Sequence, residues 1–453
     1  MKHASLTEGG MVKGFLLFAI PMLLNSIMQQ MFSTVDMYFI GNYVGKNAAA
    51  AAVGASGVLI TCMIGLFTGL TTGAGILAAR FFGSKRWKEY IEVGKTARKM
   101  SVIFGVFIML LGWMNMKSLL ILFKTPNEIL DDALLYAKTY LFGLMPMLLF
   151  QTDFALMKAS NEAKRPVYSL LLAGLINAIL DYIFILVMEW GILGASLATV
   201  ISQWIAAIFT RVMFVYYIRK KLQLSYVKVK ISRKKERNFM LKMLKIGLPA
   251  GIQAVFLTFS NLIMQYFVNQ LGIYQVAAFA AYFKIETMIY LPILAIGNTV
   301  LIFVSQNIGA KQYERIKKGV IFSLCFAVFT TLVLSFGTLL IGEEIFWILI
   351  KDKNIIAFGK TLIFICFPFY FVYAILDITG NTVRGLGNSL IPMINSIVSL
   401  GFLRIAIVSL WAANYKQLNK IAMVYPITWG ICAMLNATFL ITQWRRIKRK
   451  LEI

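Results

Sequence analysis

Histidine, cysteine and charged residues are all scarce in this sequence of 453 residues. The one histidine, His3, lies next to the N-terminus, which excludes a catalytic site or metal centre built on histidine. The four cysteines stand apart from one another, without the short spacings of zinc ligands: Cys62, Cys325, Cys366 and Cys432. Charged residues make up 14% of the chain and hydrophobic residues 59%, whereas soluble proteins carry about 25% charged residues. This composition excludes a soluble protein and predicts an integral membrane protein.

Long apolar runs take the place of the missing charges. A transmembrane helix needs about 20 mostly apolar residues, and a helix satisfies its own backbone hydrogen bonds within lipid. We therefore predict an all-α integral membrane fold with twelve spans, at residues 14–40, 50–80, 100–122, 133–157, 167–188, 193–218, 246–271, 276–306, 319–341, 355–382, 390–412 and 421–443.

The few charges are strongly biased towards positive, with 45 Lys and Arg against 19 Asp and Glu, a net charge of +26. Of the 45 basic residues, 32 lie in the two tails and the even-numbered connections and seven in the odd-numbered ones. Because basic residues collect on the cytoplasmic side, we expect both termini in the cytoplasm. The longest basic stretch, 219–245, holds only two aromatic residues. It therefore favours a loop facing anionic headgroups over a nucleic-acid surface.

Short patterns recur between the two halves of the chain. A proline stands near the start of each half, at Pro21 and Pro249. Three further landmarks recur at an offset of 226: 51–54 with 277–280, 82–85 with 308–311, and 158–166 with 384–392. We predict an N-lobe at 1–218, a basic cytoplasmic linker at 219–245 and a C-lobe at 246–453. Six spans in each half give a parallel repeat, in which the binding site is expected between the lobes.

Several motifs together resemble the multidrug and toxic compound extrusion (MATE) family, specifically its bacterial DinF-like branch. The resemblance covers nearly the whole chain and rests on Pro21, Gln29-Gln30, Asp36, Ile40-Gly41, Ala52 to Ala55, Gly69 to Ala74, Arg80, Asn177, Asp181, Gln306 to Ala310 and Arg384 to Ser389. The resemblance implies a multi-pass transporter of the bacterial plasma membrane. It would export amphipathic or cationic organic compounds as protons or sodium ions enter, by alternating access between two six-helix lobes.

The same resemblance implies that the protein is not an enzyme, has no catalytic residues, metal or cofactor, and uses only the coupling ion. The absence of a P-loop pattern agrees with transport that hydrolyses no nucleotide. We expect a monomer whose partners are a small organic substrate and the lipid bilayer, with no nucleic acid.

Ionisable residues within the spans are the candidates for function, because charge is costly in the bilayer. Asp36 stands alone in span 1, and Asn177 and Asp181 are four residues apart, on one helical face. A carboxylate pair with an amide can hold one proton or a hard cation. By motif position, the resemblance assigns a cation-coupling site to Asp36, Asn177, Asp181 and Thr199. The alternative is that these polar groups only fasten helices together.

The second half differs from part of the family, because span 7 holds no acid there. Ionisable residues within the spans of the second half form a candidate polar site, to which the sequence assigns no role: Asp377, Glu286, Lys284 and Arg404. Lys284 and Glu286 are two residues apart and therefore point to different helix faces. For Arg404 we expect an acid partner such as Asp377 or Glu286, and an internal salt bridge is as well supported as a functional role.

Candidate cleft residues for binding the substrate are Met28, Phe32, Asp153 and Phe256. Thioethers and ring faces suit a promiscuous site for bulky cations. The alternative for Met28, Phe32 and Phe256 is packing in the core or against lipid. The alternative for Asp153 is a helix contact on the cytoplasmic side.

Coupling requires that the ion bind the two access states with different affinity. Protonation removes a buried charge and so changes which packing of the lobe is favoured. The resemblance implies that the helix bends at Pro21 in response; a static proline in the first turn is the alternative. A flippase for lipid-linked saccharide, from the same superfamily, is the second transporter hypothesis and would need several basic residues in the cleft. A receptor or channel is disfavoured by the internal repeat.

Overall fold

The computed structural model describes residues 6–44, 47–223, 229–414 and 417–451. Within these ranges every regular element is a helix and there is no strand. The first half contains α1 (Met11–Tyr43), α2 (Asn47–Gly83), α3 (Trp87–Leu122), α4 (Asn127–Leu141), α5 (Leu144–Ala159), α6 (Arg165–Asp181), η1 (Tyr182–Val187) and α7 (Gly191–Lys221). The second half contains α8 (Arg233–Asn269), α9 (Ile273–Gly309), α10 (Tyr313–Leu349), α11 (Lys353–Cys366), η2 (Phe367–Phe369), α12 (Tyr370–Gly385), α13 (Leu390–Ser396), η3 (Ile397–Leu403), α14 (Arg404–Asn414) and α15 (Leu418–Leu451).

The helices account for the predicted spans. In the described part of the chain, eleven are long and apolar enough to cross a membrane. The pair α4 and α5, which bend by 44° at a short break, gives a twelfth when it is counted as one span. The predicted all-α membrane fold is therefore confirmed, with eleven or twelve helices long and apolar enough to span in the described part of the chain.

The chain forms two compact units. Unit 1 comprises residues 1–6 and 20–251, and unit 2 comprises residues 7–19 and 252–453. The boundary lies inside α8, whereas the sequence suggested the basic stretch 219–245, much of which belongs to α7 and α8. Charge composition marks where the chain meets water, but the boundary of a unit depends on where its contacts change. Both α1 and α8 change units within three residues of a proline, Pro21 and Pro249.

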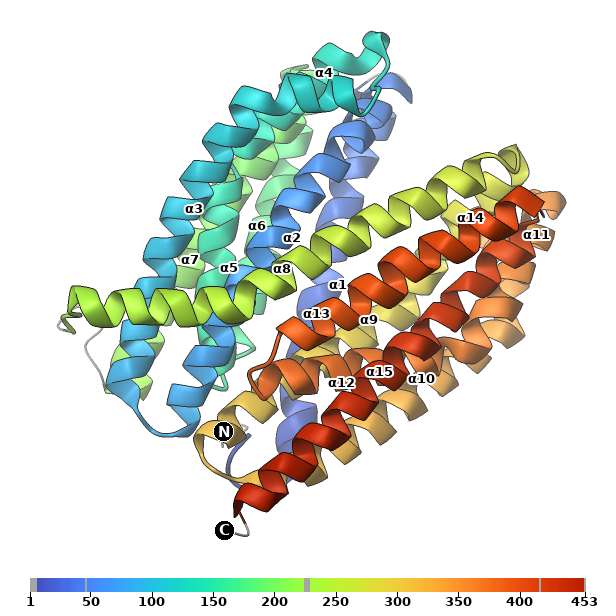
Figure 1. Cartoon of the computed structure of the whole chain (residues 1–453). Helices are drawn as coiled ribbons and strands as arrows, with labels where there is room; N and C mark the ends of the chain where they lie inside the picture. Colours follow the sequence, from blue (N-terminus) through green and yellow to red (C-terminus); the bar gives the residue numbers. More distant parts are fainter. Residues whose placement is uncertain (1–5, 45–46, 224–228, 415–416, 452–453) are drawn as a thin grey trace. The chain divides into compact units, whose positions relative to one another are not determined.

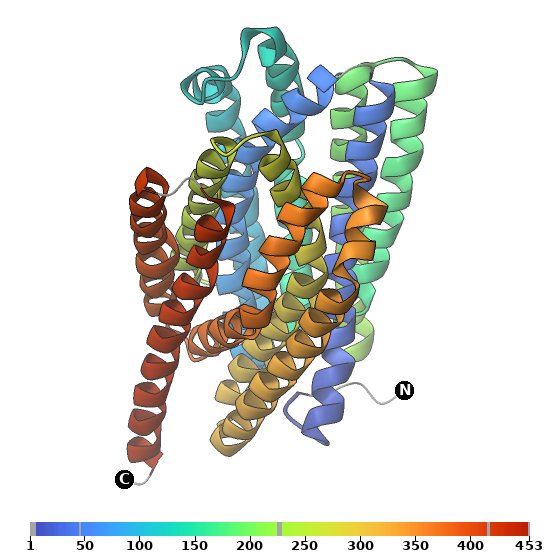
Figure 2. The same ribbon diagram turned by 90° about the vertical axis from the view of Figure 1, so that its right-hand side faces the viewer.

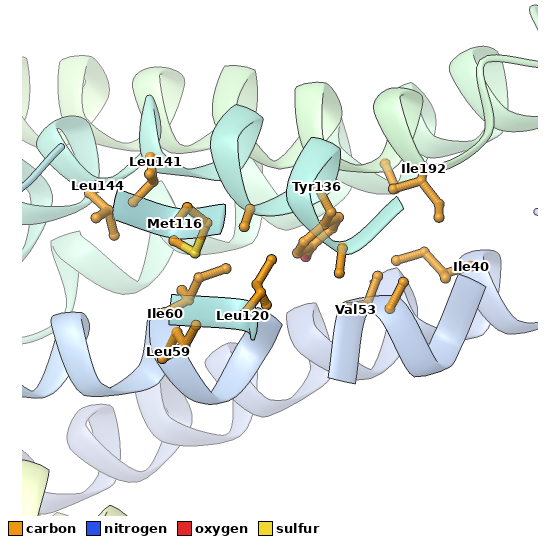
Figure 3. Packing of buried hydrophobic residues seen from close by; sticks show 14 of the residues in the cluster. Ile40, Val53, Leu59, Ile60, Met116, Leu120, Tyr136, Leu141, Leu144 and Ile192 are labelled. Carbon is orange, nitrogen blue, oxygen red and sulfur yellow. The ribbon is translucent and has the colours of Figure 1, made fainter. Parts of the chain in front are cut away.

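In unit 1, α2 packs against α3, α4 and α5, and Figure 1 shows α2, α3 and α5 running side by side. The apolar core between them includes Ile60 of α2, Leu120 of α3 and Tyr136 of α4, drawn in Figure 3. Helices inside a bilayer associate through such close packing, since lipid is as apolar as the side chains. This core fixes the position of α4, which carries a residue of the candidate site.

In unit 2, α9 packs against α10, α11 and α12, and α15 packs against α11, α12 and α14. Figure 2 shows α15, in dark red, running to the C-terminal end of the chain. Its first turns bring Tyr425 and Trp429 into the interior of the unit, where both are buried.

The internal repeat is visible in the backbone of the turns. Lys85 after α2 and Lys311 after α9 both have φ of 57°, although positive φ is uncommon for residues other than glycine. Asn161 and Gly387, which follow α5 and α12, have positive φ as well. Each pair is separated by the offset of 226 found in the sequence. The two halves therefore share local geometry as well as sequence landmarks.

Candidate functional site

Asp36 lies inside unit 1, buried to 9% exposure among helices α1, α4 and α7. Thr199 of α7 donates a hydrogen bond from its hydroxyl to Oδ1 of Asp36, at 3.3 Å. No Lys or Arg forms an ion pair with Asp36 among the described residues. The carboxyl group is therefore a buried site for charge whose protein partners are hydroxyl groups.

Asn177 and Asp181 are fully buried on one face of α6, as their spacing predicts. Neither the amide of Asn177 nor the carboxyl oxygens of Asp181 has a hydrogen-bond partner within the described ranges. Asp181 and Asp36 lie close enough for their carboxyl groups to interact electrostatically. Buried polar groups are seldom left without partners, so these oxygens are suited to receive a proton or a cation.

Tyr136 of α4 belongs to the same site and was not recognised from the sequence. Its side chain lies close enough to interact with the carboxyl group of Asp36, and its ring lies in the core shown in Figure 3. Tyr140, one turn further along α4, stacks on Tyr136 with ring centroids 5.8 Å apart. The amphipathic pattern of this short helix was the available signal, but it does not reveal which acid the tyrosines meet.

The acid site is formed by α1, α4, α6 and α7. A cavity of about 180 Å³ lies one helical turn away from it along each of these helices. It is lined by Phe32 and Ser33 of α1, Tyr140 of α4, Ala173 of α6, Ser202 and Gln203 of α7, and also by Gln29, Met147, Phe150, Gln151, Leu170 and Ala206. Residues three or four positions apart on a helix are neighbours. The cavity therefore lies beside Asp36, Tyr136, Asn177 and Thr199, one helical turn further along each of their helices.

The structure separates the candidate cleft residues. Phe32 lines the cavity, and Met28 packs against the apolar cluster beside it. Phe256, in unit 2, is 40% exposed and meets the ring of Phe402. Pro21 lies in the interior of α1, eleven residues into a helix of 33 residues, and not in its first turn.

Asp153 does not line this cavity. It is fully buried on α5, where Arg98 of α3 donates to Oδ2 at 2.5 Å and Arg211 of α7 donates to Oδ1 at 3.4 Å. This carboxylate joins three helices through ion pairs, which is the arrangement of a helix contact.

In unit 2, the candidate polar residues fall into two groups. Asp377 accepts a hydrogen bond from Asn381 at 3.0 Å and faces Gly297 of α9, where an added Cβ would come within 1.9 Å of its carboxyl oxygen. Glu286 and Arg404 both line a second cavity, but no ion pair joins them in the described part of the chain. Lys284 is exposed and does not line that cavity. Arg404 hydrogen-bonds with Asn261 and Thr428, and its expected partnership with Asp377 is not found within these ranges.

The fold of this chain matches solved structures over nearly its whole length. The chain matches a structure described as the "Outward-facing conformation of a multidrug resistance MATE family transporter of the MOP superfamily", with a TM-score of 0.89, 18% identity and 99% of each chain covered. A second match, the "Crystal structure of MATE in the bent conformation", has a TM-score of 0.88, 18% identity and full coverage of both chains. At this identity the likeness shows the fold.

The family is shown by sequence. The family model described as MatE matches residues 21–183 and again residues 249–410, which is more than half of the chain. The protein belongs to this family, the MATE transporters, and the double match falls on the predicted repeat. Relatives from Bacillus subtilis (strain 168) include the "Probable multidrug resistance protein YoeA", 24% identical with 95% of this chain and 93% of the relative covered. Another, the "Probable multidrug resistance protein YpnP", is 27% identical with 92% of each covered.

Proposed function

We propose that this protein is a secondary active exporter of amphipathic or cationic organic compounds, driven by entry of protons or sodium ions. The observation that carries the proposal is the buried cluster of Asp36, Asn177 and Asp181, whose carboxyl and amide groups lack a cationic partner in the described structure. Two neighbouring carboxyl groups in a low-dielectric interior favour uptake of one positive charge.

The cavity beside this cluster suits the proposed cargo. Its described lining combines aromatic and aliphatic side chains with the amides of Gln29, Gln151 and Gln203, and it includes no Lys or Arg. Such a surface accepts apolar rings and adapts its hydrogen bonds to different molecules. It offers no basic residue to a lipid-linked phosphate, so export of small organic compounds is favoured over the flippase hypothesis.

Coupling follows from the shared helices. Ser33 and Asp36 are neighbours on α1, as are Tyr140 and Tyr136 on α4, so a cation at the acid cluster changes the charge next to the cavity. A cation that binds one packing of these helices more tightly shifts the population towards it. Pro21 leaves a gap in the backbone hydrogen bonding of α1, which makes this helix the element we expect to bend.

Transport by the purified full-length protein in liposomes tests the proposal. A fluorescent organic cation such as ethidium is offered on the side corresponding to the cytoplasm, with proton and sodium gradients imposed separately. We expect one gradient to drive accumulation at least tenfold above the level without a gradient. Asp36→Asn, which keeps the side-chain shape, should fold normally but lose this stimulation.

A variant of an exposed acid, Glu343→Gln on α10, serves as the control and should transport like the parent. If neither gradient stimulates transport, the antiport proposal is wrong. If Asp36→Asn transports as well as Glu343→Gln does, Asp36 has no part in coupling.

A further inference from the structure

The second cavity, inside unit 2, differs in chemistry from the one in unit 1. It has a volume of about 320 Å³ and is bounded by α8, α9, α12, α14 and α15 together with η3. Its described lining contains one acid and one base, set among aromatic rings: Leu257, Asn261, Phe283, Glu286, Thr287, Tyr290, Tyr370, Tyr373, Leu400, Arg404, Tyr425 and Trp429. The cavity therefore presents both signs of charge to any molecule inside it.

Arg404 is buried to 3% exposure, and it has no carboxylate partner within ion-pair distance among the described residues. Its guanidinium donates to Oδ1 of Asn261 at 3.3 Å and to the hydroxyl of Thr428 at 3.4 Å, and it lies 4.8 Å from the ring centre of Tyr425. A guanidinium stays charged in proteins, and a buried charge that lacks a counter-ion is costly. An anionic group on a ligand would supply that counter-ion.

Glu286 supplies the opposite charge. Tyr370 donates its hydroxyl to Oε1 at 2.6 Å, and Glu286 interacts electrostatically with Arg404 without a direct bond. Because acid and base face one cavity but are not joined, each can pair with a different group of the same molecule.

Aromatic rings that contact one another line the same cavity as these two charges. Tyr373 lies 5.7 Å from Tyr290, 5.7 Å from Tyr370 and 5.5 Å from Trp429, measured between ring centroids. Such rings stack on flat apolar ligands and stabilise an ammonium group over their faces. The hydroxyl of Tyr425, which lines the same cavity, has no partner in the described ranges and is available to a ligand.

The internal repeat shows that this cavity is a diverged copy of the unit 1 site. At the offset of 226, Thr199 corresponds to Tyr425, and Arg404 falls between the counterparts of Asn177 and Asp181. Arg404 itself corresponds to Ala178, and Asp181 corresponds to Ile407, so this stretch of unit 2 gains a base and lacks the acid. Two like cation sites would keep the acids in both copies, so the second copy serves a different ligand.

We propose that the cavity of unit 2 binds zwitterionic aromatic molecules. The amine of the ligand faces Glu286, its carboxylate faces Arg404, and its ring packs against Tyr373 and Trp429. A molecule with only a cation would meet Arg404 unfavourably, and one with only an anion would meet Glu286 unfavourably. The inference extends the proposed function by naming a cargo class for this unit, but binding itself needs no ion gradient.

A matched series of indoles tests the proposal with the full-length protein in detergent. Radiolabelled L-tryptophan carries both charges, tryptamine carries only the amine and indole-3-propionate carries only the carboxylate. We expect tryptophan to bind at least tenfold more tightly than either of the others. Equal binding of all three, or tightest binding of tryptamine, would overturn the proposal. Because the assay uses no gradient, its result is independent of whether efflux is coupled to protons or sodium.

Substitutions then assign the two charges. Glu286→Gln should lower the affinity for tryptophan at least tenfold and keep or improve the binding of indole-3-propionate. Arg404→Gln should lower the affinity for tryptophan by the same factor and keep or improve the binding of tryptamine. The retained probe shows that each variant is folded. The exposed residues Glu343 and Arg446 provide controls of the same type, Glu343→Gln and Arg446→Gln, which should leave all three affinities unchanged. If Asp36→Asn or either control reduces tryptophan binding as much as Glu286→Gln does, the site is not the unit 2 cavity.

Discussion

At the scale of single residues, two buried aspartates of unit 1 have opposite surroundings. Asp36 accepts a hydrogen bond from the hydroxyl of Thr199 and lies near Tyr136, whereas Asp153 lies between the guanidinium groups of Arg98 and Arg211. A buried carboxylate with only neutral partners stays responsive to an incoming cation, and one held by two guanidinium groups does not. The surroundings of each acid, and not its depth in the membrane, therefore separate the coupling candidate from the structural ion pair.

Asp153→Asn should destabilise the protein by about 3 kcal/mol, since removal of one partner leaves buried charge uncompensated. Asp36→Asn removes a charge that has no cationic partner in the described structure, so its stability should equal or exceed that of the parent. Thermal unfolding in detergent, followed by size-exclusion chromatography, measures both. A higher unfolding temperature for Asp153→Asn than for Asp36→Asn would contradict this account of the two sites.

At the scale of helices, unit 1 contains a crossing that only glycine permits. Gly69 and Gly73 of α2 face Gly247 and Gly251 of α8, and a Cβ added at Gly69 would lie 2.3 Å from the backbone nitrogen of Gly251. Pairs of glycines four residues apart let helix backbones approach closely within lipid. The motif at 69–74 is thus explained by close packing of α2 on the first part of α8.

Gly69→Ala should destabilise unit 1 by about 2 kcal/mol, because the two helices must move apart to admit the methyl group. Gly57→Ala, on the same helix, is the matched control: nothing lies within 4 Å of its added Cβ. Loss of glycine flexibility should make that variant more stable by about 0.5 kcal/mol. Equal unfolding temperatures for the two variants would show that the crossing tolerates a larger separation.

At the scale of the whole molecule, the repeat and the distribution of basic residues determine how the chain is expected to cross the membrane. The turns at Lys85 and Lys311 share the same backbone conformation and each follows the second long helix of its half. Both belong to the basic side assigned to the cytoplasm by the positive-inside rule. By the same rule, Lys124 and Lys351, which follow the other ends of α3 and α10, are expected on the opposite side.

Single cysteines test this topology in a variant without the four native cysteines. Lys351→Cys should react with a membrane-impermeant maleimide in intact cells, and Lys311→Cys should react only in inverted vesicles. Both side chains are exposed, so access depends on the side of the membrane alone. Lys124→Cys and Lys85→Cys repeat the comparison in the first half. Reaction of Lys311→Cys in intact cells would reverse the proposed orientation.

The helices, the repeat and the family of this protein could be predicted from the sequence. Apolar runs of membrane length predicted the helices, because lipid leaves the backbone no other partner. The spacing of Asn177 and Asp181 placed both on one face of α6, where the structure has them. The family motifs predicted the MATE family, which the family model matches in both halves. Each of these inferences uses local or periodic information, which a linear sequence contains in full.

The tertiary structure alone decided which side chains meet. Tyr136 lies near Asp36 because α4 bends away from α5 and packs against α2. Asp153 forms ion pairs with Arg98 and Arg211, which lie on two other helices. Glu286 and Arg404 share a cavity although 118 positions separate them. Contacts between distant segments depend on packing and cannot be read from spacing. The sequence by itself determined the helices, the repeat and the family, and the folded chain determined which acids are paired and which are left open to a ligand.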